Sequence, residues 1–181
     1  MNGFLKIAGD YREWNVYKKS VILCDVTEMF INRALPAGSR TIDQMRQAAR
    51  SCKQNIVEGI GDNTVSSEMC IKLIGVARGS IRELREDYAD FLRQHKYEIW
   101  DKDDHRTLSL RKYSMTHYDP RDYVEKCEVR SNETVANIML TLIYQMDAML
   151  AKVLKALEAR FLEEGGIKEA MSRARRERRG Y

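Results

Sequence analysis

The stretch that decides the fold of this chain is Gln44-Met45-Arg46-Gln47-Ala48-Ala49-Arg50-Ser51-Cys52-Lys53-Gln54-Asn55-Ile56-Val57-Glu58-Gly59. Small and apolar side chains recur in it at intervals of three and four residues, and these are Met45, Ala48, Ala49, Cys52, Ile56 and Gly59. That spacing places them on one face of an α-helix. The stretch therefore predicts an amphipathic helix that packs against neighbouring helices.

The residues on either side predict where this helix begins and ends. Thr41-Ile42-Asp43-Gln44 reads as a T-x-x-Q capping box, in which the threonine hydroxyl accepts a hydrogen bond from an early backbone N–H. Gly59-Ile60-Gly61-Asp62 predicts the end, because glycine readily adopts the left-handed conformation of a helix C-cap.

Three more segments show the helical period, and breaker residues separate them. One helix is expected from about Glu13 to Leu35, ahead of Pro36-Ala37-Gly38-Ser39. Another is expected from Ser66 to about Gln94, and the last from Ser131 to the Gly165-Gly166 pair. Because the first two connections are short, the sequence predicts an all-α fold, an antiparallel up-down four-helix bundle.

Two segments lie outside the four bundle helices. Residues 96–130 form a long insertion between the third and fourth of them, with a short helix expected near Asp104 to Tyr113. Long connectors of this kind are usually functional or mobile. Residues 165–181 form a basic C-terminal tail with a helix expected over Ile167 to Arg179. The predicted organisation is a bundle over residues 1–164, insertion included, followed by the tail.

The positive charge of the chain is concentrated in that tail. The 181 residues include 31 Lys and Arg against 27 Asp and Glu, a net charge of +4. From Gly165 onward there are six basic and two acidic residues, an excess that equals the whole net charge. The bundle is therefore near neutral.

The sequence favours a cytoplasmic location. No window holds 18 consecutive apolar residues, and Met1 to Asp10 lack the basic start and apolar run of a signal peptide. The cysteines are widely spaced without a C-x-x-C pair, which favours reduced core thiols. They are Cys24, Cys52, Cys70 and Cys127.

Two rows of basic side chains flank the predicted apolar stripes. At spacings i, i+4 and i+7 they are Arg46, Arg50 and Lys53 on the second bundle helix and Arg78, Arg82 and Arg85 on the third. Arrayed Lys and Arg initiate phosphate binding, so both rows are candidate nucleic-acid contacts. The alternative is an ordinary solvated face, with the second row neutralised by Glu83, Glu86 and Asp87.

The tail carries the stronger electrostatic signal. Its closely spaced arginines are Arg173, Arg175, Arg176, Arg178 and Arg179. Runs of this kind commonly bind nucleic acid or acidic partners, and a solvated helix end is the alternative.

A polar face with small residues is a candidate subunit interface. Two glycines lie four residues apart, opposite the apolar stripe of the third bundle helix. Glycine inside a helix costs about 1 kcal/mol relative to alanine, so the pair suggests close approach of another backbone. Tolerated glycine is the alternative. The candidate interface residues are Gln47, Ser51, Glu58, Gly75 and Gly79.

The sequence offers no catalytic grouping. It has no P-loop, no G-x-G-x-x-G and no G-x-S-x-G. His95, His105 and His117 all lie close to or within the insertion, and their spacing matches no metal-binding pattern. We therefore expect neither an enzyme activity nor a cofactor or metal.

Two motifs on successive helices resemble those of a known family. They are N-I-x-E-G, here Asn55-Ile56-Val57-Glu58-Gly59, and G-S-x-x-E-L, here Gly79-Ser80-Ile81-Arg82-Glu83-Leu84. The chain resembles, over about Tyr17 to Gln94 and the last bundle helix, the four-helix-bundle family of proteins encoded in intervening sequences of bacterial large-subunit ribosomal RNA genes. The segment from Phe161 through the arginine-rich run resembles the variant with a C-terminal suffix.

This resemblance implies a bundle that assembles into rings, typically pentamers, without established catalytic residues. It also implies a relation to the accessory variability protein of diversity-generating retroelements, a basic pentameric barrel that binds nucleic acid and a reverse transcriptase. We therefore expect a homo-oligomeric accessory protein that binds RNA or DNA, assisting a reverse transcriptase or an RNA–protein complex. The alternative is a protein–protein scaffold without direct nucleic-acid binding.

Overall fold

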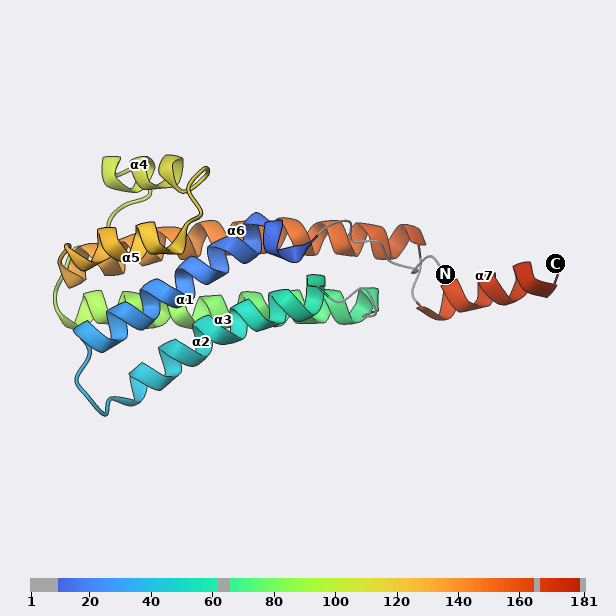
Figure 1. Cartoon of the computed structure of the whole chain (residues 1–181), viewed down its shortest axis with the longest axis horizontal. Helices are drawn as coiled ribbons and strands as arrows, with labels where there is room; N and C mark the ends of the chain where they lie inside the picture. The colour runs from blue at the N-terminus through green and yellow to red at the C-terminus, as the bar shows by residue number, and fades with distance from the viewer. Residues whose placement is uncertain (1–9, 62–65, 165–166, 180–181) are drawn as a thin grey trace.

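The computed structural model describes residues 10–61, 66–164 and 167–179, and every regular element in those ranges is helical. The predicted all-α class is thus confirmed (Figure 1). In chain order the elements are the short 3-10 helix η1 (Tyr11–Glu13) and the α-helices α1 (Asn15–Ala34), α2 (Arg40–Gly61), α3 (Ser67–Gln94), α4 (His105–Tyr113), α5 (Pro120–Glu128), α6 (Asn132–Glu164) and α7 (Ile167–Arg179).

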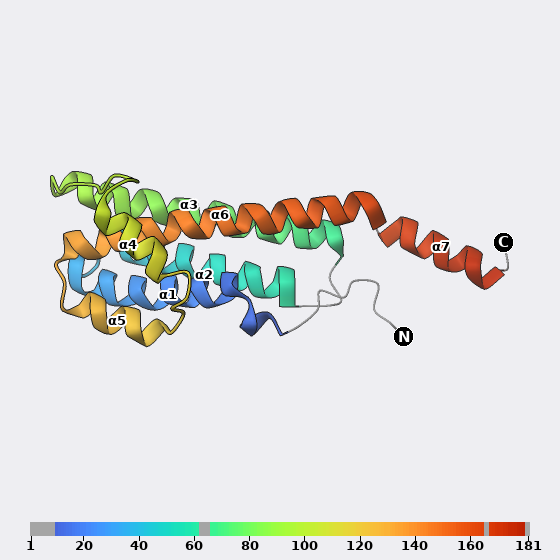
Figure 2. The ribbon, with the colours of Figure 1, turned by 90° about the horizontal axis from the view of Figure 1, so that it is seen from above.

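Four long helices, α1, α2, α3 and α6, run side by side and form the body of the molecule (Figures 1 and 2). α1 packs against α2 and α6, and α3 packs against the same two helices. α1 and α3 therefore face each other across the core. Their side chains meet there, since the Tyr88 hydroxyl of α3 donates to Thr27 Oγ1 of α1 at 3.1 Å.

An aromatic cluster lies in the core between α1 and α3. The ring centroid of Phe30 is 4.9 Å from those of both Tyr88 and Phe91. All three side chains are buried. Burial raises the pKa of Tyr88 far above its usual range, because the ionised phenol would lose its hydration. The cluster joins the two diagonal helices, and ring pairs at this separation add to the gain from burial.

The helix starts agree with the sequence at α3 and differ at α2. Ser66 caps α3, since its hydroxyl accepts a hydrogen bond from Met69 N at 3.1 Å. α2 begins one residue before Thr41, and the Ser39 hydroxyl accepts from Thr41 N at 3.3 Å. The predicted capping box at Thr41 is therefore wrong, because Ser39 occupies the capping position ahead of it.

α2 and α3 pack closely at Gly59. A Cβ atom at this position would lie 3.2 Å from Leu73 Cβ and 3.4 Å from Ile74 Cδ1, so these side chains would have to move by a few tenths of an ångström to admit a larger residue. α2 continues through Gly59 to Gly61, while the predicted end residue Asp62 lies outside the described part of the chain. Gly59 thus acts as a packing residue inside α2.

The segment between α3 and α6 contains two short helices, which lie on the outside of the body. α4 follows Asp104, whose carboxylate accepts from Arg106 N at 2.8 Å, and it confirms the short helix expected there. α5 is absent from the predicted elements. Its signal is Asp119 as N-cap followed by Pro120 at the start of the helix, a pairing that favours helix initiation. α5 packs against α1, and α4 packs against α6.

A buried lysine of α1 connects the end of α4 to the body. Lys19 of α1 is 2% exposed, and its Nζ donates to the Ser114 carbonyl oxygen at 3.2 Å and to Gln145 Oε1 at 3.1 Å. The same Gln145 oxygen accepts from the Ser114 hydroxyl at 2.6 Å. Because Ser114 is the C-cap of α4, the ammonium also lies near the negative end of that helix. Lys19 therefore holds α1, α4 and α6 at one point.

α6 is the longest described helix and leads from the body to the tail. By length and composition α6 could span a membrane, but 61% of its most apolar segment is buried inside the protein, as in the core helix of a globular domain. Between Ala151 and Glu163 none of its side chains is fully buried. α7 lies beyond its end, away from the body (Figure 1).

Candidate nucleic-acid interface

The basic row on α2 faces α1 and is partly neutralised there. The Arg46 guanidinium donates to both Glu28 carboxylate oxygens, at 2.8 and 2.9 Å, and to Asp43 Oδ1 at 3.3 Å. These hydrogen bonds from Arg46 lower the pKa of Glu28. Arg50 and Lys53 line the same shallow groove between α1 and α2. Of this row, Arg46 already has two carboxylate partners.

The basic row on α3 is neutralised more completely. Arg78 donates to the two oxygens of Asp147 on α6 at 2.8 and 3.3 Å, and Arg82 donates to the same oxygens at 3.3 and 3.4 Å. These hydrogen bonds lower the pKa of Asp147, and the bond from Arg78 makes the largest contribution. Arg85 donates to Glu86 Oε1 at 2.6 Å. Each arginine of the row therefore has a carboxylate partner.

The two rows lie on opposite sides of the body. The first row borders α1, and the second borders α6 on the far side of α3. α1 and α3 are diagonal across the core, so the α1–α2 groove and the α3–α6 groove open in different directions. The structure therefore does not bring the two predicted rows together on one surface for a phosphate chain.

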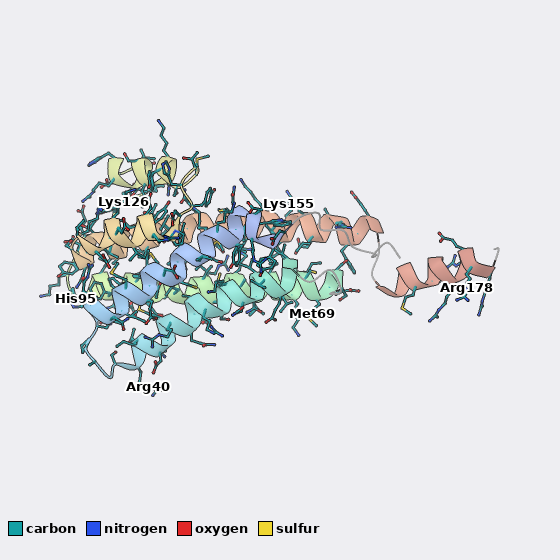
Figure 3. All side chains as sticks on the ribbon, in the orientation of Figure 1. Arg40, Met69, His95, Lys126, Lys155 and Arg178 are labelled. Carbon is teal, nitrogen blue, oxygen red and sulfur yellow. The ribbon has the colours of Figure 1, made fainter. Side chains whose placement is uncertain are left out.

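Four arginines of α7 have no such neutralisation by the described carboxylates. The described side chains Arg175, Arg176, Arg178 and Arg179 are exposed, and Figure 3 shows Arg178 far from the body. Within the described residues, no carboxylate forms an ion pair with any of these four. Arg176 donates only to the Ser172 hydroxyl, at 3.4 Å. The fifth tail arginine, Arg173, lies in α7, but its side chain is outside the described part of the structure.

A broad groove between α2 and α3 carries charges of both signs. Its volume is about 1050 Å³. The α2 wall includes Arg40, Arg46 and Arg50, and the α3 wall includes Glu83, Glu86 and Asp87. The Ser51 hydroxyl of α2 lies 2.9 Å from the hydroxyl of the buried Ser80 of α3, and the two form a hydrogen bond. The acidic wall would repel phosphates, so this groove is a poor site for a polyanion.

The predicted subunit-interface residues lie around this groove and on the outer face of α3. Gln47 and Ser51 line the groove, and Glu58 is exposed farther along α2. Gly75 and Gly79 are exposed, and a Cβ atom at either position would meet no atom within 4 Å. No contact among the described residues therefore requires glycine at these two positions.

Asp87 is destabilising in the α2–α3 groove at neutral pH. Partial burial, with smaller contributions from Asp90, Glu83 and Glu86, raises its pKa to about 6. The folded state thus binds the proton of the Asp87 carboxyl group more tightly than the unfolded chain does. The protonated group therefore stabilises the folded state below about pH 4, and this stabilisation is lost as the pH rises through 6. Asp87→Asn should raise the free energy of unfolding by about 1 kcal/mol at pH 7, a value reduced for solvent screening, and by little at pH 4.

Urea titrations of Asp87→Asn at the two pH values measure this effect. Asp43→Asn, the control, removes an exposed carboxylate from the opposite wall together with its surface ion pair to Arg46, and it should gain no stability at either pH. An equal gain in both variants, or the same gain at both pH values, would contradict the assignment to Asp87.

The cysteines and histidines form no common site. Cys24, Cys52 and Cys127 pack in or beside the core, and burial raises the pKa of Cys24 and of Cys127 to about 11. Thiols with raised pKa values react slowly at neutral pH. Within the described ranges, no three His, Cys, Asp or Glu side chains are grouped to hold a metal ion.

Two acidic residues that sequence reasoning misses decide the state of the basic rows. They are Glu28 on α1 and Asp147 on α6. Among the neutralising residues expected on α3 itself, Glu86 pairs with Arg85. Asp147 is 69 residues away from Arg78 along the chain, so no local spacing signals their contact.

Comparison with protein-family models, with curated proteins and with solved structures finds no match for this chain. Its function has to follow from its own residues and their geometry.

Proposed function

We propose that the chain is an antiparallel up-down four-helix bundle of α1, α2, α3 and α6, with α4 and α5 as an insertion, that presents α7 to nucleic acid. RNA, alone or in an RNA–protein complex, is the favoured partner, and the bundle acts as a non-enzymatic scaffold. The observation that carries the proposal is the difference in pairing. Arginines of α7 lack carboxylate partners among the described residues, whereas Arg46, Arg78, Arg82 and Arg85 have them.

This difference matters because phosphate binding depends on free positive charge. A paired arginine has to give up its carboxylate before it can release counterions from a nucleic acid. The four described tail arginines face no such competition from the described carboxylates, and they lie on a helix of 13 residues, about 20 Å long. A duplex carries about one negative charge per 1.7 Å, so several phosphates lie within reach of α7.

Exchange of the four described tail arginines for glutamine tests the proposal. Fluorescence anisotropy would follow a short labelled RNA single strand and a DNA duplex at low and at physiological salt. The variant should bind at least about 100-fold more weakly at low salt, and its salt slope on the duplex should fall by about 0.9 for each phosphate that is no longer neutralised. The matched control exchanges Arg46, Arg78, Arg82 and Arg85 for glutamine, removes equal charge, and should change affinity by less than about threefold.

Two outcomes would overturn the nucleic-acid proposal. One is equal loss of binding in both variants, which would place the contacts on the body. The other is the lack of binding by the unaltered protein at low salt. That result would favour the scaffold alternative, in which the tail docks on a protein partner such as a reverse transcriptase.

Self-assembly into a ring, such as a pentamer, is the second part of the proposal. The exposed pair Gly75 and Gly79 supports it, because packing among the described residues requires glycine at neither position and Val76 beside them is 44% exposed. Sedimentation velocity at micromolar concentration should show an oligomer, and Gly75→Glu with Gly79→Glu should dissociate it. A monomer in the unaltered protein would refute self-assembly, and an unchanged oligomer in the variant would exclude this face.

A further inference from the structure

The α2–α3 groove has the length to hold a further helix. At its narrow end the hydroxyls of Ser51 and Ser80 form a hydrogen bond at 2.9 Å. From there back to Arg40 the first turns of α2 diverge from α3 (Figure 1), and the small side chain of the buried Ala48 lines the space between them. α2 rises roughly 17 Å from Arg40 to Ser51, which matches about three turns of a docked helix.

The two walls of the groove carry opposite charges that do not pair across it. On the α2 wall, Arg40 and Arg50 have no carboxylate within ion-pair distance in the described part of the chain, and on the α3 wall, Glu83 and Asp87 likewise have no basic partner. The other charged side chains lining the groove are already paired, Arg46 with Glu28 and Asp43, and Glu86 with Arg85. With these partners included, the groove carries one net negative charge. A ligand that pairs with both walls needs cations on one side and a carboxylate on the other.

α7 has this arrangement of charges. At about 100° per residue, its four described arginines occupy about 160° of the helix circumference, and Glu177 lies opposite the middle of that arc. All five side chains are exposed, and they carry three net positive charges. The 13 residues of α7 extend about 20 Å, close to the length of the groove.

The groove and α7 of one chain lie far apart. Arg40 and Arg178 are labelled toward opposite ends of the molecule in Figure 3. A second copy can bring its α7 to the groove without any change inside either chain. We propose that the α2–α3 groove binds α7 of a second copy, with the arginines along the α3 wall and Glu177 along the α2 wall.

This contact supplies each wall with the partners that it lacks. Partial burial and the neighbouring carboxylates raise the pKa of Asp87 to about 6, and a guanidinium placed beside it would relieve that repulsion. The contact joins two different surfaces, so each copy keeps one groove and one α7 for further copies, and the assembly grows head to tail into a ring or a chain. Gly75 and Gly79 take no part, so the contact is separate from the proposed ring face, and it requires no nucleic acid.

Charge reversal, followed by mixing of the reversed proteins, tests the contact. The groove variant is Glu83→Lys with Asp87→Lys, and the tail variant is Arg175→Glu with Arg178→Glu. Sedimentation velocity would follow the full chains at about 100 µM protein in about 0.01 M salt, where surface charges are screened least. Each variant alone should self-associate at least about tenfold more weakly than the unaltered protein, because like charges then face each other.

An equimolar mixture of the two variants should recover the association. The reversed groove then meets the reversed tail, and the unaltered groove of the tail variant meets the unaltered α7 of the groove variant, so every contact again joins opposite charges. The matched control is Glu125→Lys with Glu128→Lys, which makes the same charge change at exposed positions of α5 and should associate as the unaltered protein does.

The tail variant alters exposed side chains outside the body, so its result does not depend on how well the groove variant folds. Unchanged association in the tail variant would overturn the proposal. So would an unaltered protein that stays monomeric under these conditions, equal weakening by the α5 control, or a mixture of well-folded variants that associates no better than either alone.

Discussion

Lys19→Met should remove a pH dependence of stability worth about 3 kcal/mol between pH 8 and pH 10.5. Burial lowers the pKa of Lys19 to about 8, whereas an ordinary lysine has a value near 10.5. Between these values the unfolded chain holds a proton that the folded state lacks, so a rise in pH favours folding. The free energy of unfolding of the unaltered protein should therefore increase, relative to that of Lys19→Met, as the pH rises from 8 to 10.5.

Urea titrations of both proteins between pH 7.5 and 10.5, under reducing conditions, measure this difference. The buried thiols act in the opposite direction, because burial raises the pKa of Cys24 and of Cys127 to about 11 and their unfolded forms ionise first. That effect is common to both proteins and cancels in their difference. The matched control is Lys18→Met, which removes the neighbouring ammonium, one that pairs with the exposed Glu13. A difference that stays constant with pH, or that appears equally in Lys18→Met, would contradict the role of Lys19.

Phe30→Ala should lower the free energy of unfolding by about 4 kcal/mol, the largest effect expected for one substitution. The Phe30 side chain is fully buried and contacts two aromatic rings of α3, so its removal leaves a cavity at the centre of the body. The core surrounding it can collapse only in part, because α1 and α3 are both held by α2 and α6.

Thermal and urea unfolding monitored by circular dichroism measure the loss for Phe30→Ala. Leu162→Ala, at a position of α6 that is 82% exposed, removes a large apolar side chain from the surface and should change stability by less than about 0.5 kcal/mol. A loss below about 2 kcal/mol for Phe30→Ala would show that the aromatic cluster is not the centre of the core.

The long helices were predictable because their signals are local and repeated. The apolar stripe from Met45 to Ile56, and the Ser66 cap, depend on residues within a few turns of each other. α5 has nine residues, few apolar positions and only its Asp119-Pro120 start as a signal, so periodicity misses it. The Thr41 box matches the capping pattern, whereas Ser39 is followed three residues later by Ile42 and offers only its hydroxyl as a cap. The spacing therefore favours Thr41, although Ser39 is the residue that caps α2.

The sequence predicted which basic side chains share a helix face, but not which carboxylates pair with them. Spacing alone places the arginines of each row on one flank of a helix, whereas Asp147 reaches Arg78 from a distant helix and neutralises that row. The partners of Lys19 are equally remote, at 95 and 126 residues along the chain. The α2–α3 groove has its walls on two separate helices, so no sequence motif marks it.

The length of α6 has a consequence for how the tail senses charge. Arg82 pairs with Asp147, and the helix then continues to Glu164, a rise of roughly 25 Å at 1.5 Å per residue. The screening length is about 8 Å at physiological ionic strength and about 30 Å in 0.01 M salt. At physiological ionic strength the carboxylates around Glu83 are thus too far from α7 of the same chain to interact with its arginines, whereas in about 0.01 M salt they would still attract them. The length of α6 therefore separates the charges of the tail from those of the body to an extent that depends on the salt concentration.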